Sequence, residues 1–298
     1  MTMKRIKPGE VPTGTLHAYM LGAIAPRPIA FASTVDKDGN PNLSPFSFFN
    51  AFGSNPATIV FSPARRVRGN TTKDTLDNCI ETKEVVINVV NYDLVQQSSL
   101  SSTEYAKGVN EFVKAGLTPL KSELIKPFRV AESPVQMECK VVDIIAMGQD
   151  GGAANLVICE ILLMHVNEDV LDANGVIDPN KIDLVGRMGG DWYSRASGSA
   201  IFKVAKPTGR GIGIDALPEN IRESTILTGN DLGKLGNVEA LPSAEEVETF
   251  KQLPGIKNML EINKRDKKEL EKLIHQNAKA LLDADNVIDA WKMLLSLD

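Results

Sequence analysis

Residues 27–36 read Arg-Pro-Ile-Ala-Phe-Ala-Ser-Thr-Val-Asp, and residues 42–51 read Asn-Leu-Ser-Pro-Phe-Ser-Phe-Phe-Asn-Ala. The first run is apolar and β-branched over 28–35, and the second is apolar over much of 42–49, so each predicts a strand. The residues between them include Asp-Lys-Asp-Gly-Asn at 36–40, which is a cluster of turn-forming residues. This stretch therefore predicts a β-hairpin.

More strands follow this hairpin, with a few helices between them. Short or continuous apolar runs predict strands at 57–61, 85–91, 135–146 and 156–166. Thr71 with Asp74 resembles a capping box that opens a helix ending near Thr82, and Asp93 with Gln96 opens another helix. Long helices do not alternate with the strands, which argues against a Rossmann domain. The pattern predicts a mainly β protein, an antiparallel β-barrel with inserted helices.

The chain changes character near Pro207, which suggests a domain of residues 1–205 followed by a C-terminal extension of residues 206–298. The extension is rich in glycine at first and then helical, with Ser243 and Glu246 as a capping box and Asn286 as a further cap. We expect its amphipathic helices to bury one face against the barrel or a partner chain.

Composition excludes several classes of function. The 298 residues carry 33 Lys and Arg against 38 Asp and Glu, a net charge of −5, which argues against a nucleic-acid binder. The apolar stretch at 16–32 is short and broken by two prolines and an arginine, so no membrane span is expected. The three cysteines form no C-x-x-C pair, and no apolar leader is recognised, so a cytoplasmic protein is expected. No metal site is expected.

Four motifs occur in an order that resembles the flavin reductase-like family of FMN-binding split barrels. They are the Arg-Pro strand with the Asn-x-Ser-Pro-Phe-Ser strand, Lys-Asp-Thr at 73–75, the Val-Asn-Val-Val type strand within 84–90, and Arg-Met-Gly-Gly-Asp-Trp-Tyr at 187–193. The likeness covers residues 20–205. It implies a split barrel, bound FMN and a homodimer in which the flavin lies near the seam between the two chains.

The same residues suit the chemistry of FMN. Lys73 and Thr75 at a helix start offer phosphate donors, with Arg65, Arg66 and Arg68 just upstream. Pro45 cannot donate to a ladder, so its strand must be irregular or at an edge, where backbone groups stay free for a flavin ring. The expected FMN contacts are Arg27, Ser33, Thr34, Ser44, Pro45, Phe46, Ser47, Asn50, Ser62, Arg65, Lys73, Asp74, Thr75 and Trp192.

Structural explanations stay open for several of these residues. The segment 44–50 also fits an ordinary strand with a β-bulge, and the segment 71–75 also fits a plain capped helix. Arg27 is either a phosphate ligand or a structural ion-pair partner, and Trp192 is either an interface or a core residue. His165 is the one catalytic candidate, near the nicotinamide or the flavin, and its alternative is a satisfied structural histidine.

The expected function is an oxidoreductase in which NAD(P)H delivers a hydride to FMN and the electrons pass to a second acceptor. One alternative is a flavin-dependent oxidase or monooxygenase-like protein with an organic substrate. Another is a non-enzymatic FMN protein that transfers electrons or stores flavin. The nearly continuous apolar run at 156–163 predicts a strand buried on both faces, which, with Trp192 and Tyr193, favours a homodimer.

Overall fold

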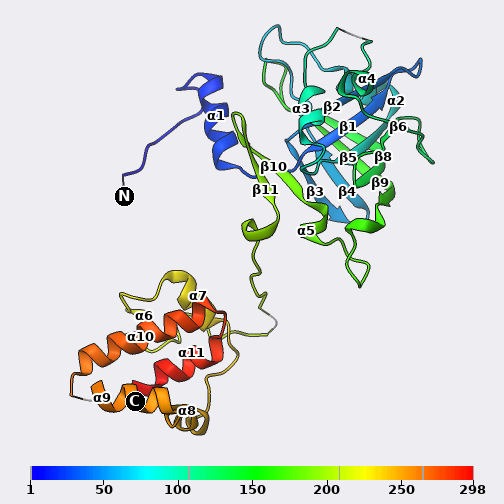
Figure 1. The fold of residues 1–298 in the computed structure, drawn as a ribbon. Helices are drawn as coiled ribbons and strands as arrows, with labels where there is room; N and C mark the ends of the chain where they lie inside the picture. The colour runs from blue at the N-terminus through cyan, green and yellow to red at the C-terminus, as the bar shows by residue number, and fades with distance from the viewer. Residues whose placement is uncertain (1, 107, 208, 264, 298) are drawn as a thin grey trace. The chain divides into compact units, whose positions relative to one another are not determined.

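The computed structural model describes residues 2–106, 108–207, 209–263 and 265–297, and it divides into two compact units, Met1–Phe202 and Lys203–Asp298 (Figure 1). The division falls three residues before the domain boundary expected from the sequence. Each unit has its own apolar core, so each is described by itself.

A seven-stranded antiparallel sheet forms the first unit, in the order β2-β1-β5-β8-β9-β4-β3. The strands at the two ends of this order, β2 and β3, are joined by Ser47 and Phe48 alone. Two residues span at most about 11 Å, so the sheet must curl until its edges approach. The result is an open barrel, as predicted. The strands are β1 Ala30–Val35, β2 Pro41–Phe46, β3 Phe49–Ser54, β4 Ala57–Phe61, β5 Glu84–Val89, β8 Val135–Ala146 and β9 Asn155–Val166.

The inside of the barrel is filled by the inward side chains of the strands and by α2, Asp74–Thr82. All three cysteines lie here as free, buried thiols. Burial raises the pKa of Cys79 and of Cys139 to about 12, so these thiols stay protonated. They therefore act as small apolar core groups and not as nucleophiles.

A second apolar cluster lies on the outer face of β1, around Phe31 and Leu43, so β1 is buried on both faces. It is covered by short elements that the sequence did not predict or only partly predicted. The covering residues come from α3 Val95–Leu100, α4 Glu111–Ala115, β7 Arg129–Val130 and β10 Leu184–Gly189. Of the other short elements, β6 Pro119–Leu120 pairs with β7, β11 Trp192–Ala196 pairs with β10, and α5 Pro179–Ile182 contributes Ile182 to a separate small cluster. An unpredicted helix, α1 Thr13–Ala23, packs on β10.

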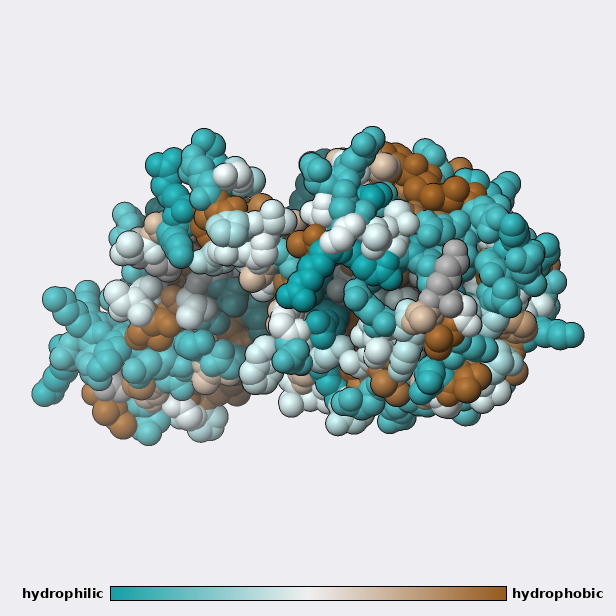
Figure 2. Space-filling model, turned by 90° about the horizontal axis from the view of Figure 1, so that it is seen from above, coloured by the Kyte–Doolittle hydropathy of each residue, from teal (hydrophilic) through white to brown (hydrophobic). Residues whose placement is uncertain are grey.

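Two sequence interpretations need correction. The predicted strand at 42–49 is interrupted, because the chain bends at Ser47 and Phe48 before β3 begins. The strand β9 is not buried on both faces within one chain: residues alternate between buried and partly exposed, and Leu162 is 41% exposed. Its apolar run therefore leaves an outer strip uncovered. On the face that Figure 2 presents, apolar side chains gather in small groups separated by polar ones.

The second unit is a set of helices around Trp291, which is fully buried and whose Nε1 donates to the Leu235 carbonyl at 3.1 Å. These helices bury their apolar faces against one another, which accounts for the amphipathic pattern within the unit. The predicted caps at Ser243 and Asn286 are confirmed. The helices are α6 Glu219–Arg222, α7 Gly229–Gly236, α8 Ala244–Lys251, α9 Pro254–Asn263, α10 Lys267–Asp283 and α11 Val287–Leu294.

A glycine contact ties the start of this unit to α7. The Gly213 N–H donates to the Gly236 carbonyl at 3.0 Å, and a Cβ added at Gly211 would lie 2.6 Å from the same oxygen. Only glycine fits at that distance. In the part of the chain that the structure describes, no helix is long and apolar enough to cross a membrane.

His275 makes the second unit sensitive to acid. It is 4% exposed; its Nδ1 accepts from the Ser224 hydroxyl at 2.8 Å, because that oxygen already accepts two backbone N–H groups, and its Nε2 has no hydrogen-bond partner. Burial lowers the pKa of His275 below its ordinary value, against a smaller opposite effect of Glu271. The unfolded chain thus binds a proton first as the pH falls.

We expect the second unit to lose stability as the pH falls below about 6.5, by up to about 1.4 kcal/mol per pH unit. Urea unfolding followed by Trp291 fluorescence, in a Trp192→Phe background, measures this between about pH 5.5 and about pH 7.5. The variant His275→Leu should flatten the dependence. An equal dependence in that variant would assign the effect to other groups.

Candidate functional site

The strand β2 lies at an edge of the sheet, as Pro45 requires. The backbone nitrogens of Leu43 and Pro45 point in the same direction, towards the open edge of the sheet. The Leu43 N–H is taken by the Glu111 carboxylate at 3.1 Å, and Pro45 has no N–H. Burial raises the pKa of Glu111 against the effect of this hydrogen bond. The edge is thus closed to another strand over these positions.

The opposite face of β2 meets the start of α2. Asn42 donates from Nδ2 to the hydroxyls of Thr75, at 2.9 Å, and Thr34, at 3.1 Å. The Thr34 hydroxyl also accepts from Asn78 at 3.0 Å, and both threonines are buried. This network holds α2 against the sheet and engages the hydroxyls of Thr34 and Thr75, while Ser44 lies on the same face of β2 as Asn42.

Lys73 is the N-cap residue of α2, in an extended conformation and without a capping hydrogen bond from its side chain. Its Nζ lies 5.3 Å from the centre of the Phe46 ring, and it makes no ion pair among the described residues. Burial and the charge of Arg66 lower the pKa of Lys73, with a smaller opposite effect of Glu104. A partly buried ammonium group beside a helix N-terminus attracts an anion.

Ser62 is connected to this lysine only indirectly, through two aromatic rings. It follows Phe61, whose ring centre is 5.6 Å from that of Phe46, and the Phe46 ring carries Lys73 on it. Ser62 is 6% exposed, and its hydroxyl has no hydrogen-bond partner. An unpaired buried hydroxyl is costly, and a bound oxyanion would satisfy it. Phe46 thus contacts both Lys73 and Phe61, the residue before Ser62, and Asp74 is the first residue of α2.

The capping box predicted at Thr71 and Asp74 is wrong, because Arg66 donates to the Thr71 hydroxyl at 3.2 Å and to the Thr72 carbonyl. Of the three loop arginines, Arg65 is used within the loop, where it donates to Asn70. Arg66 also pairs with Glu104 at 3.3 Å. Arg68 makes no side-chain hydrogen bond or ion pair with any described residue, so its charge is uncommitted.

The arginine loop is fixed by the turn between β8 and β9. Arg65 exchanges backbone hydrogen bonds with Ala153 and Gly152, at 2.9 and 3.1 Å, and Asn70 donates to the Gln149 carbonyl at 2.8 Å. A Cβ added at Gly151 would lie 2.8 Å from the Val67 carbonyl oxygen, so this position requires glycine. The turn between β8 and β9 thus supports the arginine loop.

Four expected contacts lie away from the Lys73 group. Ser33 points to the opposite face of β1 from Thr34 and is buried with an unpaired hydroxyl. Asn50 is exposed on β3, and Trp192 is 77% exposed at the start of β11. Arg27 is buried next to Ser47 and the end of α1, and it makes no ion pair among the described residues.

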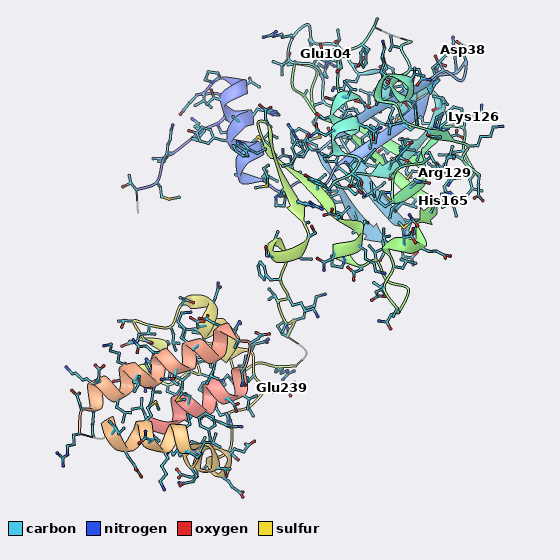
Figure 3. The ribbon with its side chains drawn as sticks, in the orientation of Figure 1. Asp38, Glu104, Lys126, Arg129, His165 and Glu239 are labelled. Carbon is cyan, nitrogen blue, oxygen red and sulfur yellow. The ribbon has the colours of Figure 1, made fainter. Side chains whose placement is uncertain are left out.

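His165 is paired with a buried carboxylate. Its Nε2 lies 2.8 Å from Glu138 Oε1, and Glu138 also accepts the N–H groups of Glu123 and Leu124 at 2.8 and 2.7 Å. Burial raises the pKa of Glu138, but these hydrogen bonds outweigh it, so the net shift is downward. Arg129 lies near the same carboxylate, at 3.9 Å. Figure 3 labels Arg129 and His165, which belong to the same part of the first unit. This arrangement favours the structural alternative for His165.

Replacing His165 should therefore affect stability and not flavin binding. We expect His165→Leu to lower the free energy of unfolding of the first unit by about 1–3 kcal/mol, because Glu138 loses a buried partner. His165→Gln retains a donor and should recover part of the loss. Urea titrations and FMN affinities of the three proteins test this, and a large loss of FMN affinity with unchanged stability would point to a catalytic role instead.

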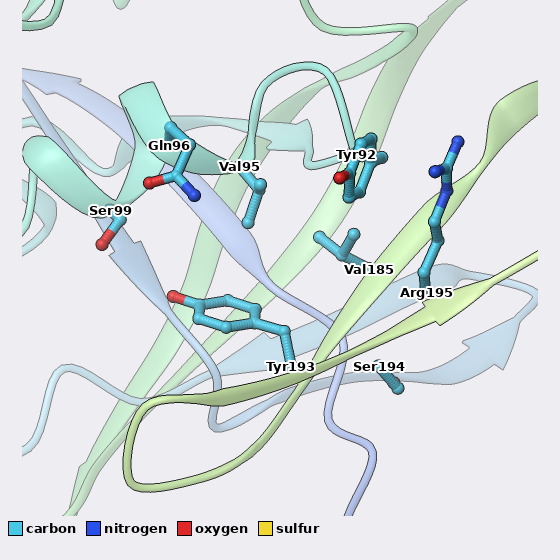
Figure 4. A pocket seen from close by; sticks show the side chains of 8 residues that line it. All are labelled: Tyr92, Val95, Gln96, Ser99, Val185, Tyr193, Ser194 and Arg195. Carbon is cyan, nitrogen blue, oxygen red and sulfur yellow. The ribbon is translucent and has the colours of Figure 1, made fainter.

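A pocket of about 180 Å³ lies between α3 and the β10–β11 hairpin, and no sequence signal pointed to it. Arg195 stacks over the Tyr92 ring at 3.8 Å and pairs with Asp183 through Nε and Nη2. The Tyr193 hydroxyl points towards Ser99 and Gln96 (Figure 4). The lining residues are Tyr92, Val95, Gln96, Ser99, Val185, Tyr193, Ser194 and Arg195. Residues a hundred positions apart form this pocket, so only the fold reveals it.

Residues 21–181, more than half of the chain, match the family model of the flavin reductase like domain. The chain belongs to the flavin reductase-like family. It is 37% identical to an uncharacterised protein of Aquifex aeolicus over 65% of this chain and 97% of the relative. A protein of Halalkalibacterium halodurans is 34% identical over 68% of this chain and 97% of the relative.

Solved structures of this family have the same barrel. Nitrilotriacetate monooxygenase component B from Bacillus cereus superposes with a TM-score of 0.64 and 30% identity, over 68% of this chain and all of that chain. A flavin reductase with a split-barrel domain from Shewanella frigidimarina gives a TM-score of 0.55 at 27% identity, over 65% of this chain and 94% of that chain. The split-barrel fold and the family expected from the sequence are confirmed, and the chain is a flavin reductase-like oxidoreductase.

Proposed function

We propose that this flavin reductase-like chain binds FMN non-covalently, with the phosphate at the start of α2. The observation that carries the proposal is the partly buried ammonium group of Lys73, which has no carboxylate partner among the described residues; the unpaired buried hydroxyl of Ser62 is a second candidate donor. Both groups fit a phosphate, and the helix N-terminus adds favourable potential. Arg68 has a free charge that can reach out from the fixed loop.

The chain's own residues bind and position the cofactor, and the bound flavin supplies the acceptor for a hydride from NAD(P)H. Phe46, on the inner face of β2, contacts Lys73, and Ser44 lies on the same face of this strand. Reduction by NAD(P)H requires no general acid–base pair of the chain. The alternative is an FMN protein that carries electrons or stores flavin without oxidising a nicotinamide.

We also propose that the protein works as a homodimer in the cytoplasm. Apolar side chains on the outer strip of β8 and β9 lack a cover within one chain, and Val142, Ile145 and Leu162 are all partly exposed. An exposed apolar strip of this kind marks an association surface. A mass of two chains in light scattering would support the dimer, and a mass of one chain for the FMN-loaded protein would contradict it.

We expect Lys73→Ala to weaken FMN binding about 10- to 150-fold, the loss of a charge-assisted hydrogen bond of about 1.5–3 kcal/mol. Riboflavin lacks the phosphate, so its affinity should change little. Fluorescence quenching of each flavin measures both affinities. Lys126→Ala removes a lysine from the loop before β7 and serves as the matched control.

An unchanged FMN affinity in Lys73→Ala would move the phosphate away from α2. An equal loss for riboflavin would instead indicate damage to the fold, since no phosphate is present to lose a contact. The double comparison thus separates a phosphate site from a general effect on the barrel.

Reduction by nicotinamides tests the redox part of the proposal. We expect the FMN-loaded protein to lose its absorbance in the visible region when NADH or NADPH is added without oxygen. Bleaching by dithionite but by neither nicotinamide would favour the electron-carrier alternative. A protein that takes up no FMN at all would contradict the proposed function.

A further inference from the structure

Arg27 is a buried guanidinium group with one unpaired edge. It is 5% exposed and lies between the end of α1 and the start of β1. Its Nη1 donates to the carbonyls of Leu21 and Ile24, at 2.6 and 2.7 Å, and so holds the last turn of α1. Its Nε makes only a long contact of 3.5 Å with the Ser47 hydroxyl, and its Nη2 has no hydrogen-bond partner.

No carboxylate balances this charge among the described residues. The charged group that acts on Arg27 is another arginine, Arg187, whose backbone exchanges hydrogen bonds with that of Arg27 at 3.0 and 2.9 Å. Burial, and secondly Arg187, lower the pKa of Arg27. Arg187 donates to the Gly190 carbonyl and lies over the Tyr193 ring, so it has no carboxylate either. A buried cation in this state lacks the compensation that such groups normally have.

Arg195, in the same unit, shows what the Nε–Nη2 edge of an arginine binds when a partner is present. Arg195 places Nε and Nη2 against the two oxygens of Asp183, with contacts of 2.8 and 2.6 Å. Arg27 presents the same two nitrogens towards Ser47, where no carboxylate stands. Two coplanar oxygens match this edge in both spacing and charge.

The bend between β2 and β3 lies beside this edge. Ser47 is only partly buried, and its hydroxyl is the group nearest to the open side of Arg27. An anion at Ser47 would replace the long Nε contact and reach Nη2. The two cationic sites differ in their surroundings: Lys73 packs on Phe46, a residue of the barrel interior, whereas Arg27 pairs with the β10–β11 hairpin.

We propose that the Nε–Nη2 edge of Arg27, together with the Ser47 hydroxyl, binds the carboxylate of a small organic anion at a site separate from the FMN phosphate site. That the two sites are separate rests on the proposed function, whereas the carboxylate site itself does not. The carboxylate supplies two oxygens to the guanidinium edge and accepts from the serine. Its binding neutralises the buried charge that the fold leaves uncompensated.

Thermal unfolding of the full chain with added anions tests the site. Sodium acetate, sodium benzoate and inorganic phosphate are titrated at constant ionic strength, with chloride as the balancing salt. We expect the carboxylates to raise the midpoint of the first unit by at least about 2 °C near saturation. Arg27→Gln should abolish the shift, whereas Arg195→Gln, at an arginine whose edge Asp183 already fills, should keep it.

The variant Ser47→Ala provides a second test in case Arg27→Gln does not fold. It leaves Arg27 in place and should weaken the carboxylate response several-fold without removing it. No carboxylate-dependent shift in the wild type, or an equal shift in Arg27→Gln, would overturn the proposal. A response to phosphate alone would also overturn the assignment of a carboxylate ligand.

The same titration with bound flavin separates the two proposals. A carboxylate response that persists in the FMN-loaded protein supports a separate site. If FMN removes the response and riboflavin does not, the Arg27 edge holds the FMN phosphate, and the separate site is refuted while FMN binding stands. If FMN fails to bind and the carboxylate response remains, the proposed function fails and the anion site stands.

Discussion

Ser47 and Phe48 join the two strands that lie at opposite ends of the sheet order, and this short connection constrains the whole first unit. It forces the sheet to curl, because a chain of two residues cannot bridge two distant edges. It leaves Phe46 inside the barrel and brings Ser47 to the buried Arg27. Both proposed anion sites are thus built on adjacent residues of one bend.

Charge pairing separates the groups that stabilise this fold from those that are available to a ligand. Arg195 has a carboxylate partner, and so do Arg66 and Arg129, at distances of 2.6 to 3.9 Å. Lys73 and Arg27 have none among the described residues. Many exposed lysines and arginines in the described part of the chain also lack a carboxylate partner, but Lys73 is partly buried and Arg27 is buried. Since a buried charge is usually paired, these two cations indicate function more strongly than the motif residues Thr34 and Thr75, whose hydroxyls are already engaged.

Periodicity and local signals were sufficient for the strands and several caps. The strands at 57–61 and 135–146 have the predicted bounds, because an apolar run between turn residues is decided locally. The cap at Thr71 failed because Arg66 competes for the same groups, and such competition depends on a loop fixed by a turn eighty residues away. The hairpin over Arg27 and the pocket beside Tyr193 were equally out of reach, since both depend on long-range packing.

The second unit shows why an amphipathic pattern does not identify the surface that it covers. The leucines of α10 predicted a buried face, and that face is buried, but its partners are the other helices around Trp291. The periodicity of apolar residues predicts that one face of a helix is buried, but it does not identify the element that buries it. Each unit has its own core, and the residues named for the Lys73 and Arg27 sites all belong to the first unit. The amphipathic pattern of α10 is therefore explained by the second unit itself, without reference to the flavin site.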